Sequence, residues 1–85
     1  MVSRIMYTLY TKPDCSYCDN LKKLLDYQGI EWNAIEIGRD ITRDEFIEQF
    51  PDVKKVPYVL DHDDNVIGGY NDTVEMLKNV NSNTN

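Results

Sequence analysis

Four short blocks of apolar residues along the chain have the pattern of β-strands. They are rich in β-branched and aromatic residues and are bounded by Gly, Pro, Asn or Asp, as strands usually are. We expect strands at residues 5–10, 30–37, 56–61 and 65–68. The first block is apolar almost without interruption, which is typical of a strand buried on both faces. It is therefore expected to lie in the centre of a sheet.

Three other segments repeat apolar residues at helical spacing. The first begins after the break at residues 12–14 and ends near Gly29, a residue type that commonly terminates helices. Its apolar stripe consists of Cys18, Leu21, Leu24 and Leu25.

The second helix is expected to begin at a capping box, because Thr42 is followed three residues later by Glu45. Pro51 stands just beyond its end. Its inward residues are predicted to be Phe46, Ile47 and Phe50, and its solvated residues Arg43, Asp44 and Glu48.

The last helix follows Gly68 and Gly69, with Asn71 or Asp72 expected as its N-cap. Its apolar stripe is predicted to be Val74, Leu77 and Val80. A glycine loop that leads into a helix N-terminus can also accept a carboxylate, although the glycines could equally serve only the turn.

The order of these elements, β-α-β-α-β-β-α, predicts an α/β fold. A short connection after the first helix makes the second strand parallel to the first, with a right-handed crossover. The turn at residues 62–64 joins the last two strands as an antiparallel hairpin. This acidic turn resembles the start of a calcium loop, but Val66 stands where such loops need glycine, so we expect a plain turn.

Composition places the chain among ordinary globular domains. It has 85 residues, enough for one domain, with 41% hydrophobic and 28% charged residues. No apolar run approaches the length of a membrane span, and residues 1–10 lack the apolar stretch of a signal peptide, so we expect a cytoplasmic protein. The net charge of -6 argues against nucleic-acid binding.

Both cysteines, Cys15 and Cys18, stand one helical turn apart at the start of the first helix. Unpaired N–H groups at a helix N-terminus favour a thiolate, and Lys12 adds a positive charge nearby. In Cys-X-X-Cys sites the pKa of the first thiol falls from about 8.5 to roughly 3.5–7.5. We expect Cys15 to attack and the more buried Cys18 to resolve.

Two further interpretations of the cysteines are less consistent with the sequence. Zinc prefers four ligands, and His62 is the only histidine, so a zinc site within one chain is not expected. The cysteines could instead be inert buried residues, but their polar, loop-like surroundings argue against this.

Five lysines are expected to gather around the cysteines and to attract an anionic ligand; they are Lys12, Lys22, Lys23, Lys54 and Lys55. At individual positions these lysines could simply solvate the surface.

Three motifs together resemble the glutaredoxin family: Lys12-Pro-Asp-Cys-Ser-Tyr-Cys18, Lys55-Val56-Pro57 and Gly68-Gly-Tyr-Asn-Asp72. The chain is similar to short dithiol glutaredoxins, including those of the bacteriophage type. This resemblance implies a thioredoxin-like fold with a four-stranded mixed sheet flanked by three helices. The glutaredoxin domain would cover residues 1–80, leaving 81–85 as a polar tail.

The resemblance also implies a groove for glutathione beside Cys15. Pro57 would form a cis peptide facing the disulfide, and Val56 would pair its backbone with the cysteinyl part of glutathione. Lys12 matches the position near the glycine carboxylate, whereas Asn71 and Asp72 match those at the γ-glutamyl end. The full set of glutathione-binding residues is expected to be Lys12, Tyr17, Lys55, Val56, Pro57, Gly69, Tyr70, Asn71 and Asp72.

The function implied is glutathione-dependent reduction of protein disulfides and glutathione mixed disulfides, by a monomer with no resident metal. Ribonucleotide reductase is the type of protein substrate that the family often serves. Ser16 departs from the commonest family motif, and some relatives with this change resemble carriers of a [2Fe-2S] cluster held between two chains with glutathione. A thioredoxin-type donor supplied by a flavoprotein reductase and a non-catalytic adaptor are also compatible with the cysteine pair.

Overall fold

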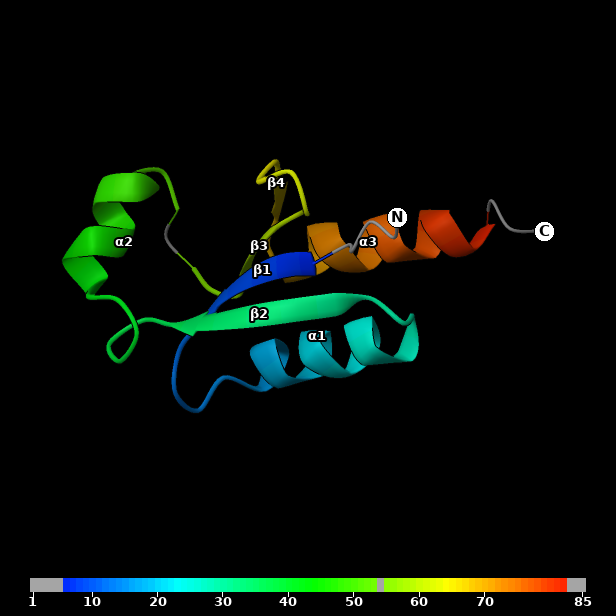
Figure 1. The fold of residues 1–85 in the computed structure, drawn as a ribbon, viewed down its shortest axis with the longest axis horizontal. Coiled ribbons are helices and arrows are strands. Elements are labelled where there is room, and N and C mark those ends of the chain that lie inside the picture. The colour runs from blue at the N-terminus through cyan, green and yellow to red at the C-terminus, as the bar shows by residue number, and fades with distance from the viewer. Residues whose placement is uncertain (1–5, 54, 83–85) are drawn as a thin grey trace, which may run out of the picture.

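The computed structural model describes residues 6–53 and 55–82 and has the predicted order of elements (Figure 1). The strands are β1 (Met6–Thr11), β2 (Glu31–Glu36), β3 (Tyr58–Leu60) and β4 (Val66–Gly68). The helices are α1 (Ser16–Tyr27), α2 (Arg43–Gln49) and α3 (Tyr70–Ser82). The predicted α/β architecture, with four strands and three helices, is confirmed.

The strands form one mixed sheet in the order β2-β1-β3-β4. β1 pairs in parallel with β2 and antiparallel with β3, and β3 pairs antiparallel with β4. The central position of β1 is therefore confirmed. Burial along both faces is confirmed only for its second half, because Met6 is exposed whereas Leu9, Tyr10 and Thr11 are buried.

Successive residues of β1 enter two separate hydrophobic cores, because neighbouring side chains of a strand point to opposite faces of the sheet. Leu9 belongs to a core built from β1, β3, α1 and α3, and Tyr10 to a core that includes Phe46 of α2. The molecule thus has three layers, with α1 and α3 on one face of the sheet and α2 packed against the other.

Helix α1 ends in a Schellman motif at the predicted glycine. Gly29 has a φ of +74°, and its N–H donates to the carbonyl of Asp26 at 3.0 Å. The N–H of Ile30 donates to the carbonyl of Leu25 at 2.9 Å, as the motif requires.

Helix α2 begins at the predicted capping box. The N–H of Glu45 donates to Oγ1 of Thr42 at 3.0 Å, and Oε1 of Glu45 accepts the N–H of Thr42 at 2.8 Å. The prediction that Ile47 points inward is wrong: its side chain is 43% exposed, because α2 is a short helix that packs against the sheet mainly through Phe46.

Helix α3 begins at Tyr70, earlier than predicted, so neither Asn71 nor Asp72 is its N-cap. The physical reason is a pair of hydrogen bonds to the carbonyl of Gly69, which accepts the N–H of Thr73 at 3.0 Å and its Oγ1–H at 2.9 Å. Leu77 is buried as predicted, whereas the side chain of Val80 lies outside the described part of the chain. The helix ends at Ser82.

Candidate functional site

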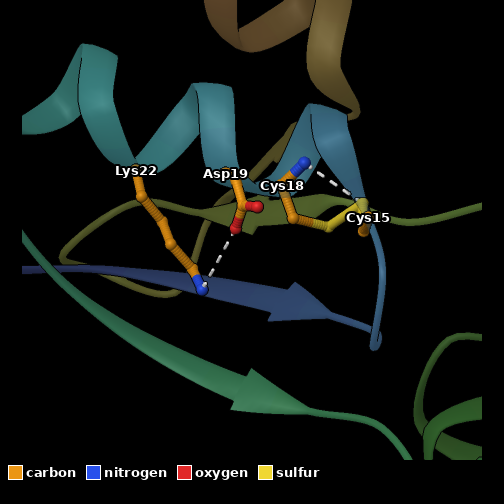
Figure 2. A network of polar contacts seen from close by, with 4 residues as sticks. All are labelled: Cys15, Cys18, Asp19 and Lys22. Carbon is orange, nitrogen blue, oxygen red and sulfur yellow. Dashed lines mark hydrogen bonds and ion pairs between the residues drawn. A yellow bond between two sulfur atoms is a disulfide. The ribbon is translucent and has the colours of Figure 1, made fainter.

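Cys15 and Cys18 form a disulfide at the start of α1, as Figure 2 shows. Cys15 is the N-cap of the helix, with extended backbone, and its Sγ accepts the backbone N–H of Cys18 at 3.1 Å. Cys18 is 1% exposed and Cys15 is 7% exposed, so the predicted difference in burial has the right sign. Cys15, the more exposed of the two cysteines, is also the one whose Sγ accepts a backbone N–H of the helix.

The loop before β3 reaches the same end of the sheet. Tyr58 pairs with Tyr10 across β3 and β1, which places Pro57 beside the end of β1, where the cysteine loop begins. The Val56–Pro57 peptide bond is cis, as the family resemblance implied, and Pro57 is buried.

The glycine loop before α3 lies against this proline. A Cβ atom on Gly69 would lie 3.7 Å from the carbonyl oxygen of Pro57, and the N–H of Gly69 donates to Oδ2 of Asp72 at 3.4 Å. Sequence alone left open whether the glycines only serve a turn. The structure answers this in part, because their loop packs on the cis-proline loop.

Two tyrosines join the starts of α1 and α3. The rings of Tyr17 and Tyr70 lie 4.8 Å apart between centroids, and Tyr17 is 60% exposed. Tyr17 is therefore available on the surface next to the disulfide. Asn71 is also exposed, at the start of α3.

Lys12 and Lys55 line one cavity of about 950 Å³, which they share with Val56. The predicted gathering of lysines is wrong for Lys22 and Lys23, which do not line this cavity. Nζ of Lys22 lies 4.0 Å from Oδ1 of Asp19 (Figure 2). It also lies 5.7 Å from the centre of the Trp32 ring. Lys23 lines a separate hollow with Tyr70. Lys54 lies outside the described residues.

Two residues of this region were missed by the sequence analysis. Arg43, expected on a solvated face, lines the cavity together with Lys12 and Lys55. Thr73 is fully buried and fixes the start of α3 through Gly69. A sequence signal existed for Thr73, since a threonine hydroxyl in a helix can donate to the carbonyl four residues before it, but none existed for Arg43.

Shifted pKa values are found at two tyrosines of β1 and at aspartates outside the cysteine loop. Burial, followed by the charge of Asp61, raises the pKa of Tyr7, and burial followed by the charge of Asp64 raises that of Tyr10. The backbone N–H of Asn65 holds the pKa of Asp61 below its ordinary value.

Residues 6–53 and 55–82 contain no cluster of three or more His, Cys, Asp or Glu side chains placed to hold a metal ion. None of the helices in these ranges is long and apolar enough to cross a membrane.

Comparison with known proteins agrees with this geometry. The chain is 28% identical over 71 residues to the Gene 56 protein of Mycobacterium phage D29, covering 82% of this chain and 79% of that protein. Glutaredoxin 1 from Francisella tularensis, solved in complex with cacodylate, has the same fold, with a TM-score of 0.76 and 20% identity over 92% of this chain and 98% of that one.

A buckwheat glutaredoxin solved in complex with glutathione is 25% identical, with a TM-score of 0.71, covering 86% of this chain and 68% of that chain. The glutaredoxin family model matches residues 7–65, which is more than half of the sequence. With its disulfide-forming cysteine pair at the start of α1, the chain belongs to the glutaredoxin family.

Proposed function

We propose that this protein is a glutathione-dependent thiol–disulfide oxidoreductase that reduces protein disulfides and glutathione mixed disulfides. The observation that carries the proposal is the meeting of three segments at one end of the sheet. The loop of Cys15, the cis-Pro57 loop and the Gly69 loop come together there. These are the segments that a glutathione groove beside the nucleophile requires.

The charges around the cysteines suit glutathione, which carries two carboxylates and one ammonium group. Lys12 and Lys55 stand on one side of the site and would receive the glycine carboxylate. Asp72 and the exposed Asn71 stand at the start of α3 and would receive the γ-glutamyl end, with Asp72 facing its ammonium group. Tyr17 and Tyr70 would close the groove between them.

The chemistry begins with the reduced pair. The Cys15 thiolate, favoured by the N–H of Cys18, attacks one sulfur of a substrate disulfide and expels the other sulfur as a thiolate. A mixed disulfide on Cys15 remains. If the bound partner is glutathione, the thiolate of a second glutathione attacks the sulfur of the bound one. The bond to Cys15 breaks, glutathione disulfide leaves, and the Cys15 thiolate is restored.

A protein substrate is released by the buried thiol. Cys18 loses its proton and attacks Sγ of Cys15, which breaks the mixed disulfide and forms the Cys15–Cys18 disulfide. Two glutathione molecules then supply the two electrons that restore both thiols. We further propose that the enzyme works as a monomer in the cytoplasm. Ribonucleotide reductase is one candidate among its protein substrates.

Turnover of a small glutathione mixed disulfide tests the proposal. The assay contains glutathione, glutathione reductase and NADPH, and a parallel assay replaces the glutathione system with thioredoxin reductase. We expect NADPH consumption in the glutathione assay alone. Turnover only with thioredoxin reductase would contradict the proposal, and so would failure in both assays.

A pair of charge variants then tests the groove. Lys12→Gln should raise KM for glutathione about 2- to 5-fold, because one exposed charge pair contributes up to about 1 kcal/mol. Lys78→Gln removes an equal charge from an exposed position on α3 and should leave KM unchanged. Equal effects of the two variants would show that only net charge matters.

A further inference from the structure

The cavity beside the cysteine loop has a cationic rim and an apolar lining. Its volume is about 950 Å³, and its rim carries Lys12, Arg43 and Lys55. Phe46 and Ile47 of α2 contribute to its apolar lining, which extends to residues between β2 and α2 and after α2. Lys12 lines the cavity and follows β1 directly, three residues before Cys15, so the cavity reaches the start of the loop that carries the cysteines.

Among residues 6–53 and 55–82, the side chains of Lys12, Arg43 and Lys55 form no ion pair and no hydrogen bond, so these three cations have no acidic partner there. Other bases of the chain do, since Lys22 pairs with Asp19 and Arg39 with Asp40 at 3.5 Å.

This concentration of positive charge stands out against the chain as a whole, which has 15 acidic and only 9 basic residues. Unpaired cations around a hollow attract a negatively charged group and hold it there.

The positive charge of Arg43 is unfavourably placed in its own helix. It occupies the first position of α2, where the helix dipole favours negative charge, and Asp44 and Glu45 already supply that charge. Ile47 follows one turn later and is 43% exposed, although large aliphatic side chains are usually buried. Residues four apart lie on the same side of a helix, so α2 presents a cation and an apolar group together at the cavity.

Glutathione matches only part of this surface. Its glycine carboxylate would suit Lys12, but it carries no aliphatic or aromatic side chain to cover Phe46 and Ile47. A polypeptide with an acidic residue next to an apolar one matches both the rim and the lining.

We propose that this cavity docks the polypeptide beside the disulfide of a protein substrate and selects sequences in which an acidic residue neighbours an aliphatic or aromatic one. The inference rests on the proposed function, because it names the substrate class of the same site. Arg43 and Ile47 act as specificity residues and do not touch the reacting sulfurs.

A single-turnover experiment tests the docking without glutathione. Reduced protein in excess is mixed at low ionic strength with a peptide that contains one internal disulfide, the reaction is stopped with acid, and the reduced peptide is quantified. The Cys15–Cys18 pair supplies both electrons and is oxidised to its disulfide as the peptide gains two thiols. Failure of glutathione-dependent turnover therefore does not affect the result.

Four peptides that differ only beside the cysteine separate the two recognition elements: they carry Glu-Leu, Gln-Leu, Lys-Leu or Glu-Ser. We expect the Glu-Leu peptide to react about 2- to 5-fold faster than Gln-Leu, with Lys-Leu slower still, because each exposed charge contact contributes up to about 1 kcal/mol. Glu-Ser should also react more slowly than Glu-Leu. Equal rates for all four peptides would overturn the proposal.

Variants assign the selectivity to the cavity. Arg43→Gln should lower the ratio of Glu-Leu to Gln-Leu rates, and Ile47→Ala should lower the ratio of Glu-Leu to Glu-Ser rates. Lys78→Gln, with the same loss of charge on α3, should leave both ratios as in the unmodified protein. The proposal is also overturned if Lys78→Gln reduces the first ratio as much as Arg43→Gln, because the selectivity would then reflect net charge alone.

Discussion

Gly68 and Asp72 are packed so closely that a Cβ atom on Gly68 would lie 2.9 Å from the Cβ of Asp72. Gly68 also has a φ of +126°, a conformation that side chains rarely adopt. The turn from β4 into α3 therefore has room only for glycine at this position. Gly69 is less constrained, since its added Cβ would make an ordinary contact with Pro57.

This difference predicts opposite outcomes for two neighbouring substitutions. Gly68→Ala should lower the free energy of unfolding by about 1–3 kcal/mol, through backbone strain and the contact with Asp72. Gly69→Ala should change it by less than about 1 kcal/mol. Urea denaturation of both variants provides the measurement, and equal losses would contradict this account of the turn.

The two cysteines should be separable by their substrates. Cys15→Ser should abolish all turnover, because no thiolate remains at the helix N-terminus. Cys18→Ser should retain reduction of glutathione mixed disulfides and lose reduction of protein disulfides, which needs the resolving thiol. The check is to assay both variants on both substrate types. Complete loss of activity in Cys18→Ser on the glutathione substrate would refute the assigned roles.

The capping box of α2 should contribute measurably to stability. Thr42→Ala removes the acceptor for the N–H of Glu45 and should cost about 1 kcal/mol of unfolding free energy. Thr42→Ser keeps a hydroxyl at the same position and serves as the control. If thermal or urea denaturation finds the serine variant as unstable as the alanine variant, the methyl group and not the cap is responsible.

Acid should weaken the turn between β3 and β4. The folded-state pKa of Asp61 lies below its unfolded value of about 3.9, so its carboxylate stabilises the fold above that pH and loses this effect as pH falls through the folded pKa. Asp61→Asn should be less stable than the unmodified protein at pH 7.

The difference in unfolding free energy caused by Asp61→Asn should shrink on titration from pH 5 towards pH 2. Asp52→Asn, at an exposed carboxylate after α2, is the matched control. A difference for Asp61→Asn that stays constant with pH would contradict the role of its charge.

Local signals explain why so much of the fold was predictable. The capping box at Thr42, the terminating Gly29 and the apolar block of β1 each depend on neighbouring residues, so sequence spacing was enough to place them. The pairing of Lys22 with Asp19 was readable in the same way, since residues three apart are neighbours on a helix, and it was overlooked.

Contacts between distant segments account for what sequence did not predict. The exposure of Ile47 and the position of Arg43 depend on a cavity that joins the end of β1, α2 and the loop before β3. The sequence predicted the start of α3 too late because Asn71 and Asp72 are typical N-cap residues. In the structure, the carbonyl of Gly69 accepts the first hydrogen bond of the helix, from the N–H of Thr73.

The strand directions place the cysteine loop and the turn between β3 and β4 at opposite ends of the sheet. β1 runs towards the cysteines and β3 runs away from them, so the turn at residues 61–65 lies at the opposite end of the sheet (Figure 1). Helix α3 begins at Tyr70, which contacts Tyr17 beside the cysteines, and its C-terminal end points away from them. A dye, a surface tether or a fused reductase attached at that turn should therefore leave Cys15 accessible to substrate disulfides. The turn is a suitable attachment site for coupling the protein to an electrode or for building a biosensor.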